Sequence, residues 1–198
     1  MNGSIYEREL ANILSGNKNT IERMGKNIDP LSRDILYTLT EKPFYVARAA
    51  GSFGADLVAL RDDFSLVIEV KSSERDQLSF SEASGNKQDQ AIKLHNKCVL
   101  SGLFITYAYR LKSFRGDFWR FFSIESNYEY KGKMRGLYEI LPKQDITKSG
   151  NFILRWNNGL ILLGAGESAI RFIPPLIIKN EEIDNAIEIL DKSIKNSL

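Results

Sequence analysis

The sequence predicts an α/β protein in which strands alternate with amphipathic helices. Five short runs rich in β-branched and aromatic residues have the length of strands, and they lie at residues 44–50, 55–60, 64–71, 102–109 and 118–124. Around them, apolar residues recur every three or four positions, which indicates helices that pack on one side. The chain has 198 residues, of which 43% are apolar and 26% charged, so it can bury a core without disulfides.

The first helix is expected from Ser4 to about Gly16, where the apolar residues have helical spacing. Residues 16–42 are polar at first and return to a helical pattern after Pro30. The first two strands are separated by a Gly-rich turn. A tight turn at residues 61–63 then predicts a hairpin between the second and the third strand.

A polar loop at residues 72–85 leads into a helix at residues 87–100, after which the last two strands of the sheet are expected. The end of the chain has a different pattern. Two short strands are expected there at residues 160–163 and 169–173, followed by an amphipathic helix at residues 181–194.

Composition and charge exclude several classes of protein. No stretch of about 18 apolar residues is present, so no transmembrane helix is expected, and the first residues have no apolar run of signal-peptide type. The single cysteine, Cys98, excludes an internal disulfide and agrees with a cytoplasmic protein. Residues 51–101 carry 6 basic and 8 acidic side chains, whereas residues 102–150 carry 9 basic and 5 acidic ones. The acidic part suits a metal ion, and the basic part is either a phosphate-binding surface or an ordinary solvated face.

The residues that carry chemistry are Asp56, at the start of the second strand, and Glu69 and Lys71 on the third. Residues i and i+2 of a strand point to the same face, so Glu69 and Lys71 project together. Paired strands lie about 4.8 Å apart, which allows Asp56 to face that pair. Metal-assisted hydrolysis of a phosphodiester needs such a set, because carboxylates hold Mg²⁺ and a lysine orients water or stabilises charge. Glu7, on the first helix, is a candidate for a further carboxylate.

Each of these residues also has a structural interpretation. Ser4 and Glu7 form a Ser-x-x-Glu capping box, which stabilises the N-terminus of a helix. Asp56 fits a turn residue that caps its strand, and Glu69 with Lys71 fits a surface ion pair. Against the last interpretation, the third strand is apolar on both faces, as a central strand is, and charged residues at its end need a partner or a function.

The motifs occur in the order and with the spacing of a known family. They are Gly3-x-x-x-Glu7-Arg8-Glu9-Leu10, Val46-x-Arg48-x-Ala50-Gly51-Ser52-x-x-x-Asp56-Leu57-Val58-Ala59 and Ile68-Glu69-Val70-Lys71. The chain thereby resembles the archaeal Holliday junction resolvases, over roughly residues 3–14 and 44–124. The resemblance implies a restriction-endonuclease-like fold, in which helices flank a mixed β-sheet and the nuclease site is an Asp followed by Glu-x-Lys.

The resemblance also implies roles for individual residues. The implied catalytic residues are Glu7, Ser52, Asp56, Glu69 and Lys71. Among them, Glu7, Asp56 and Glu69 are the implied metal ligands, for Mg²⁺ with Mn²⁺ as the alternative ion. Arg48 is the implied contact to a DNA phosphate.

The implied partner is branched DNA, a four-way junction, bound by a homodimer with one active site in each subunit. Phosphate contacts are expected from basic residues beside the site and in the basic part of the chain, namely Arg48, Arg75, Lys87, Arg110, Lys112 and Arg115. Gln88 is expected at a solvated helix start, with a contact to the site or to DNA as the alternative. His95 is expected to be packed in the core rather than to bind a metal.

The chain departs from the family pattern in two places. Residues 16–42 intervene between the first helix and the first strand, and residues 125–198 extend beyond the usual end of the family. Turn-forming residues gather between positions 142 and 151 and indicate a boundary there. We therefore expect a nuclease domain at residues 1–148, with an insertion at about 16–42, and a small C-terminal strand-helix extension at residues 149–198.

The extension has a resemblance of its own, to the C-terminal end of class III pyridoxal-phosphate aminotransferases. The similar motifs are Gly159-Leu160-Ile161-Leu162-Leu163-Gly164, Ile170-Arg171-Phe172-Ile173-Pro174-Pro175-Leu176 and Glu181-Glu182-Ile183. Those enzymes need a large domain with a Schiff-base lysine, and nothing in the chain matches it. No pyridoxal phosphate is therefore expected.

The predicted function is that of a Mg²⁺-dependent, structure-selective endonuclease that resolves four-way junctions in recombination and repair. Two alternatives stay open, because the motif specifies the reaction and not the substrate. One is a related nuclease with another DNA target, of restriction, flap or repair type. The other is a DNA-binding module whose nuclease site is silent.

Overall fold

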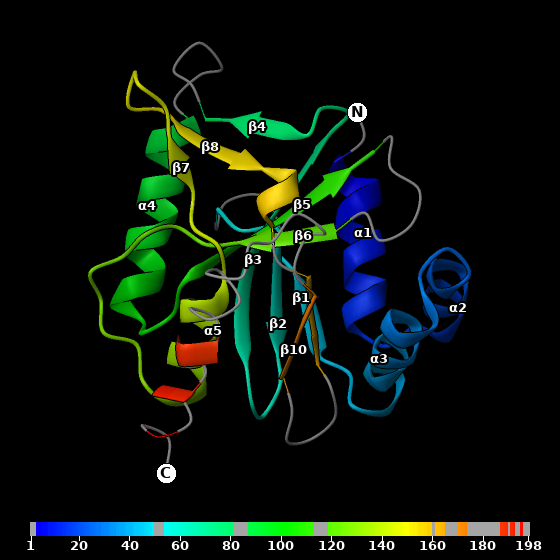
Figure 1. Cartoon of the computed structure of the whole chain (residues 1–198). Helices are drawn as coiled ribbons and strands as arrows, with labels where there is room; N and C mark the ends of the chain where they lie inside the picture. Colours follow the sequence, from blue (N-terminus) through cyan, green and yellow to red (C-terminus); the bar gives the residue numbers. More distant parts are fainter. Residues whose placement is uncertain are drawn as a thin grey trace.

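The computed structural model describes residues 3–49, 54–80, 87–112, 119–159, 161–164, 170–173, 187–189, 191–192 and 195. A five-stranded sheet with the order β1-β2-β3-β5-β6 forms its centre (Figure 1). The strands are β1 (Tyr45–Arg48), β2 (Leu57–Leu60), β3 (Ser65–Ser73), β5 (Ile105–Leu111) and β6 (Trp119–Phe122). Because β3 and β5 are parallel and the other pairs antiparallel, the predicted mixed sheet is confirmed.

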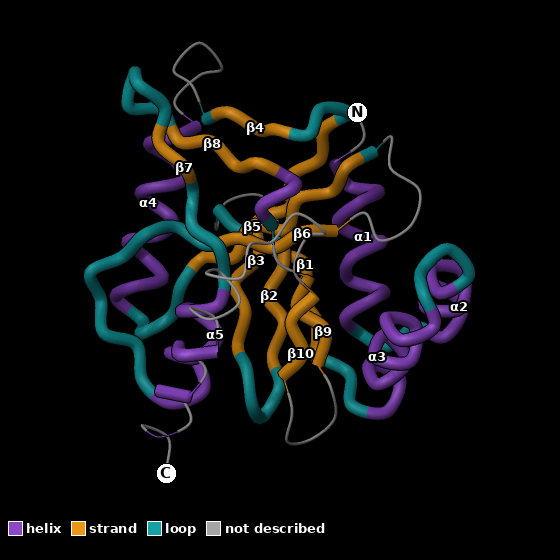
Figure 2. Tube along the Cα trace, viewed as in Figure 1, coloured by secondary structure: helices purple, strands orange, loops and turns teal. Residues whose placement is uncertain are grey.

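Helices flank this sheet, as predicted, and Figure 2 shows α1 (Gly3–Leu14), α2 (Lys18–Gly25) and α3 (Pro30–Glu41) beside one another at one side of it. Two further helices are α4 (Lys87–Leu100) and α5 (Gly132–Ile140). Asn17 accepts a hydrogen bond from the backbone N–H of Thr20 and begins α2. Asp29 does the same with Ser32 and begins α3, with Pro30 in the first turn. Residues 16–42 thus form two helices.

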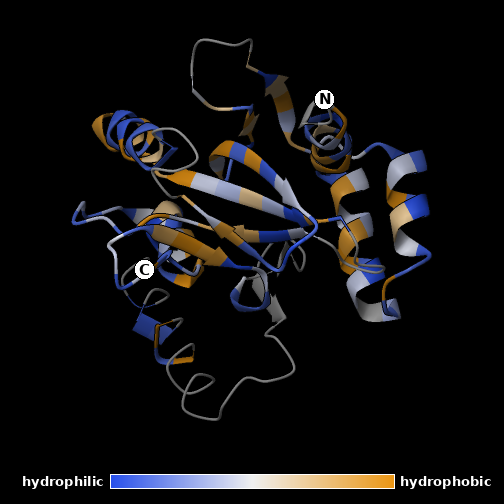
Figure 3. Ribbon diagram, turned by 90° about the horizontal axis from the view of Figure 1, so that it is seen from above, coloured by the Kyte–Doolittle hydropathy of each residue, from blue (hydrophilic) through white to orange (hydrophobic). Residues whose placement is uncertain are grey.

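The two faces of the sheet carry separate core clusters, because alternate strand residues point to opposite sides. One cluster joins Leu10 of α1 and Ile21 of α2 to Ile68 in the sheet. The other joins Leu94 of α4 to Tyr107, on the face that α1 does not cover. The helices carry hydrophobic and hydrophilic residues together, as Figure 3 shows, and their apolar residues supply these two clusters. None of the described helices is long and apolar enough to cross a membrane.

A second, three-stranded sheet has the order β4-β8-β7. Its strands are β4 (Gln77–Ser79), β7 (Asp145–Ile146) and β8 (Phe152–Arg155). The boundary predicted after residue 148 lies in the turn between β7 and β8, and β8 pairs with β4 from the middle of the chain. Leu154 and Trp156 are buried in the same cluster as α4. The turn-forming residues there make a hairpin, and residues on both sides of position 148 pack in the same core cluster.

The end of the chain contributes a further hairpin. Strands β9 (Ile161–Gly164) and β10 (Ile170–Ile173) pair antiparallel, which confirms the two short strands expected there. Strand β9 contacts α3 and β6. Most of the helix expected at residues 181–194 lies outside the described residues, among which 187–189 and 191–192 are helical.

Candidate active site

Asp56 is held at the open end of the β2–β3 hairpin. In this hairpin Leu57 lies opposite Ile68, and the backbone N–H of Asp56 donates to the carbonyl of Ile68 at 3.0 Å. The side chain of Asp56 accepts a hydrogen bond from the backbone N–H of Val70 at 2.7 Å. Val70 lies between Glu69 and Lys71. This hydrogen bond therefore places the Asp56 carboxylate next to the stretch of β3 that carries both of them, as predicted.

Glu69 and Lys71 lie on one face of β3, as the strand period predicts. Their side chains form an ion pair, with 2.5 Å between the Lys71 ammonium nitrogen and a Glu69 carboxylate oxygen. The side chains are 32% (Lys71) and 17% (Glu69) exposed, so the pair is largely enclosed. Tyr107 and Tyr109 of the parallel strand β5 lie opposite Glu69 and Lys71. The pair therefore lies on an enclosed part of a central strand and is not a loose surface salt bridge.

Glu7 approaches this group from α1. Its carboxylate forms an ion pair with Arg48 of β1, at 2.7 Å, and the Arg48 and Glu7 side chains are 43% and 22% exposed. Helix α1 begins at Gly3, so Ser4 is already helical and is not the residue before the helix. A capping serine has to precede the first helical residue, so this helix start disfavours the capping-box interpretation of Glu7.

Three carboxylates influence one another in this region. Burial raises the pKa of Glu69, Lys71 lowers it, and the negative charges of Asp56 and Glu7 raise it. The pKa of Asp56 is also raised, chiefly by burial, and Glu7 again adds to the shift while the Val70 N–H and Lys71 oppose it. Negative charges that are buried and repel one another are stabilised by a cation.

The oxygen donors of Asp56, Glu69 and Glu7 fit a hard divalent cation such as Mg²⁺. In the described part of the chain, no three His, Cys, Asp or Glu side chains are already gathered as a set of metal ligands. Two of these carboxylates form ion pairs with basic side chains: Glu7 with Arg48, and Glu69 with Lys71. The three carboxylates thus suit the ion in chemistry, and Asp56 accepts a hydrogen bond from the Val70 N–H.

Of the predicted DNA-contacting residues, Arg48 pairs with Glu7, and the structure separates the others into three groups. Arg75 and Lys87 are exposed, the first after β3 and the second at the start of α4. Arg110 and Lys112 pack against α1, where the Arg110 guanidinium forms an ion pair with Glu9 at 2.8 Å. The third group is Arg115 alone, which lies outside the described residues. The predicted active-site residue Ser52 lies outside them as well.

Sequence reasoning missed two contacts of α1 with β5, those of Glu9 and Tyr6. Arg110 lies over the Tyr6 ring, with 4.5 Å between the guanidinium carbon and the ring centroid. The run Tyr6-Glu7-Arg8-Glu9 was the available signal, but the basic partner of Glu9 is 101 residues away. His95 is buried, which agrees with the expected packed histidine.

Gln88 also has a role that the sequence did not indicate. Its side-chain amide donates to the carbonyl of Gly150 at 3.1 Å, and its side-chain oxygen accepts from the N–H of Phe152 at 2.9 Å. Both partners belong to the β7–β8 hairpin. Gln88 therefore joins α4 to the small sheet, which is neither of the two interpretations that the sequence suggested.

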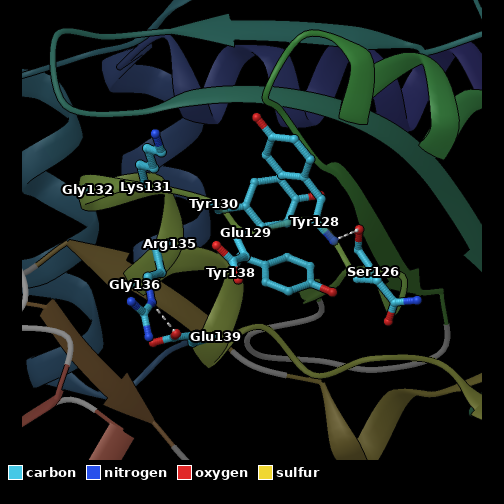
Figure 4. Close-up of a pocket in the computed structure, with 11 residues that line it drawn as sticks. Ser126, Tyr128, Glu129, Tyr130, Lys131, Gly132, Arg135, Gly136, Tyr138 and Glu139 are labelled. Carbon is cyan, nitrogen blue, oxygen red and sulfur yellow. Dashed lines mark hydrogen bonds and ion pairs between the residues drawn. The ribbon is translucent and has the colours of Figure 1, made fainter.

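A pocket of about 700 Å³ lies beside α5 (Figure 4). Three tyrosines gather at it, with ring centroids 4.9 Å apart for Tyr128 and Tyr130 and 4.5 Å apart for Tyr130 and Tyr138. All its lining residues lie between positions 126 and 139. It is therefore separate from the predicted site residues.

The family model of the archaeal Holliday junction resolvases matches residues 20–87. The resemblance to that family is confirmed. The match covers about a third of the chain and includes Asp56, Glu69 and Lys71, whereas Glu7 lies outside it. A solved Holliday junction resolvase of Archaeoglobus fulgidus is 24% identical, with 62% of this chain and 79% of that chain covered and a TM-score of 0.37.

The chain also has a shorter similarity, to two aminotransferases. Over 38 residues, or 19% of the chain, it is 45% identical to an acetylornithine aminotransferase of Nostoc and 47% identical to one of Bacillus cereus. The chain spans only 9% and 10% of the length of these two enzymes. The resemblance to aminotransferases is therefore confirmed as a short, partial one.

Proposed function

We propose that the chain is a metal-dependent, structure-selective endonuclease that resolves four-way DNA junctions. The observation that carries the proposal is the convergence of Asp56, Glu69 and Lys71 on one hairpin, within the segment that matches the junction-resolvase family. Charged side chains that are largely enclosed on a central strand are rare without a chemical role. The reaction is hydrolysis of a phosphodiester, in which water adds to phosphorus and the bond to one ester oxygen breaks.

Each residue has a distinct part in this reaction. Asp56 and Glu69, with Glu7, would hold Mg²⁺, or Mn²⁺ as the alternative, which when bound lowers the pKa of water and polarises the phosphate. The Val70 N–H fixes the orientation of the Asp56 carboxylate. Lys71, oriented by Glu69, stabilises the negative charge that develops on the phosphate oxygens.

DNA binding is proposed to depend on phosphate contacts from basic side chains around the site. Arg48 lies beside Glu7, and the exposed residues Arg75 and Lys87 follow the Glu-x-Lys strand. Such contacts carry no base information, so they suit recognition of a branched shape. Because a four-way junction has approximate two-fold symmetry, paired cuts are made most simply by a homodimer with two sites.

A cleavage assay tests the function directly. Purified protein with Mg²⁺ is incubated with a four-way junction and, separately, with a linear duplex of the same sequence. We expect paired incisions in the junction and no cutting of the duplex, with binding that weakens steeply as salt rises. Equal cutting of both substrates would indicate another nuclease target, and binding without any cutting would indicate a silent site.

Glu7 is tested by a substitution that keeps its shape. Glu7→Gln is expected to lose most of the cleavage activity with little change in melting temperature, because an exposed ion pair contributes only about 0–1 kcal/mol. Glu139→Gln is the matched control, since Glu139 also lies on a helix and pairs with an arginine, Arg135, at 2.7 Å. Wild-type cleavage by Glu7→Gln, together with a lowered melting temperature, would make Glu7 a purely structural residue.

A further inference from the structure

Glu7 lies on α1, whose apolar side chains hold the helix on the sheet. Helix α1 rests on the sheet through apolar residues such as Leu10 and Leu14. This packing places the helix, but it makes no polar contact that would direct the Glu7 carboxylate. The ion pair between Glu7 and Arg48 is partly open to solvent, and such pairs hold a side chain weakly. A metal ligand needs a partner that fixes its position.

A second set of contacts orients the N-terminal half of α1 on the sheet. The Arg110 guanidinium on β5 pairs with Glu9 at 2.8 Å, and the two side chains are only 13% (Arg110) and 16% (Glu9) exposed. The same guanidinium lies 4.5 Å above the Tyr6 ring. Tyr6 and Glu9 are three residues apart, so they lie on one face of the helix. We call Tyr6, Glu9 and Arg110 the α1–β5 cluster.

In the register of the sheet, the α1–β5 cluster lies one position from the residues that carry the proposed site. Arg110 is opposite Ser72, and the preceding position pairs Tyr109 with Lys71. Glu7 lies in the helical turn between Tyr6 and Glu9. The contacts that fix α1 on β5 therefore set the rotation of the helix that carries Glu7, relative to the strand that carries Lys71.

We propose that Arg110, acting through Glu9 and Tyr6, is a positioning residue for Glu7 and not a DNA contact. The inference rests on the proposed function, in which Glu7 is a metal ligand. Arg110 is suited to this part because a planar guanidinium can pair with a carboxylate and stack on an aromatic ring together. A side chain that is mostly enclosed and paired in this way has little access to a phosphate.

The test measures Mn²⁺ binding to the DNA-free protein by calorimetry. Arg110→Met is expected to weaken Mn²⁺ binding by about tenfold, as removal of a partner behind a metal ligand does. Arg110→Lys, which keeps the charge but not the fork, should lie between Arg110→Met and the wild type. The control is Arg135→Met, which removes a remote ion pair of similar length and should leave Mn²⁺ binding unchanged.

A double-variant comparison separates positioning from general damage. In a Glu7→Gln background, Arg110→Met should weaken Mn²⁺ binding no further, because it acts through Glu7. An additional tenfold loss in that background would overturn the proposal. So would unchanged Mn²⁺ binding in Arg110→Met beside a weakened Glu7→Gln, which would leave the role of Glu7 intact. If Arg110→Met does not fold, Arg110→Lys and Glu9→Gln carry the same comparison.

The salt dependence of junction binding gives an independent readout. A phosphate contact by Arg110 would lower the slope of log affinity against log salt by about one when it is removed. The proposal expects the slope to stay unchanged in Arg110→Met, so a drop of that size would overturn it. If Glu7→Gln itself leaves Mn²⁺ binding unchanged, the metal-ligand role of Glu7 fails together with this inference.

Discussion

Asp56→Asn and Glu69→Gln are each expected to abolish Mg²⁺-dependent cleavage of a four-way junction while binding of the junction persists. Each change removes one negative charge from the proposed metal site and keeps the shape of the side chain. A loss of several kcal/mol of transition-state stabilisation corresponds to a rate reduction of about 10³-fold or more. Single-turnover cleavage and a gel-shift titration, performed on the same preparations, measure the two effects separately.

The metal-free stability of these variants has a predicted sign. The Asp56 carboxylate is partly buried near two other carboxylates, so its pKa is raised and the charged form costs stability at neutral pH. Asparagine keeps an oxygen that can accept from the Val70 N–H, so Asp56→Asn should melt no lower than the wild type. Asp62→Asn, at the far turn of the same hairpin, is the control and should cleave normally. Near wild-type cleavage by Asp56→Asn or Glu69→Gln would remove the site assignment.

A chain that ends at Gly150 is expected not to fold. It lacks β8 and the residues after it, including Ile153, Leu154 and Trp156, which are at most 7% exposed. Burial of one such side chain contributes about 1.5–3 kcal/mol, and a whole domain has a net stability of about 5–15 kcal/mol. The truncation also leaves β4 without its partner strand and Gln88 without its partner at Phe152.

The matched control is a chain that ends at Gly159, which keeps β8 and the buried Trp156. Thermal unfolding followed by circular dichroism should show a cooperative transition for this longer chain and none for the chain that ends at Gly150. The opposite result, a cooperative transition in both, would mean that the small sheet is dispensable. It would also support the domain boundary that the turn-forming residues indicated.

The sequence was informative where the pattern was local. The β2–β3 hairpin and the shared face of Glu69 and Lys71 follow from the period of a strand and a tight turn, and the structure has both. The small sheet was missed because β4 and β7 are only three and two residues long, too short for an alternating pattern. Helix α5 was missed because its first residue is Gly132 and the residue before it makes no side-chain capping hydrogen bond.

Contacts between distant segments could not be predicted in the same way. Glu7 has a partner 41 positions away and Glu9 one 101 positions away, and no periodicity connects such residues. The basic charge of Arg110 was visible, and a basic residue in a basic stretch suggested DNA. Only the fold shows that its guanidinium is turned inward onto Glu9.

The number of residues between two contacting positions also determines the order in which the parts of the site can form. The contact of Asp56 with Val70 spans only 14 positions, so it closes a short loop and can form within a local hairpin. Glu9 can pair with Arg110 only after the ribosome has added Arg110, about 5–20 s later at roughly 5–20 residues per second. A nascent chain can therefore bring Asp56, Glu69 and Lys71 into register before Glu9 pairs with Arg110. If Arg110 positions Glu7 as proposed, the Glu7 carboxylate takes its final orientation only after β5 has been synthesised and has paired with β3.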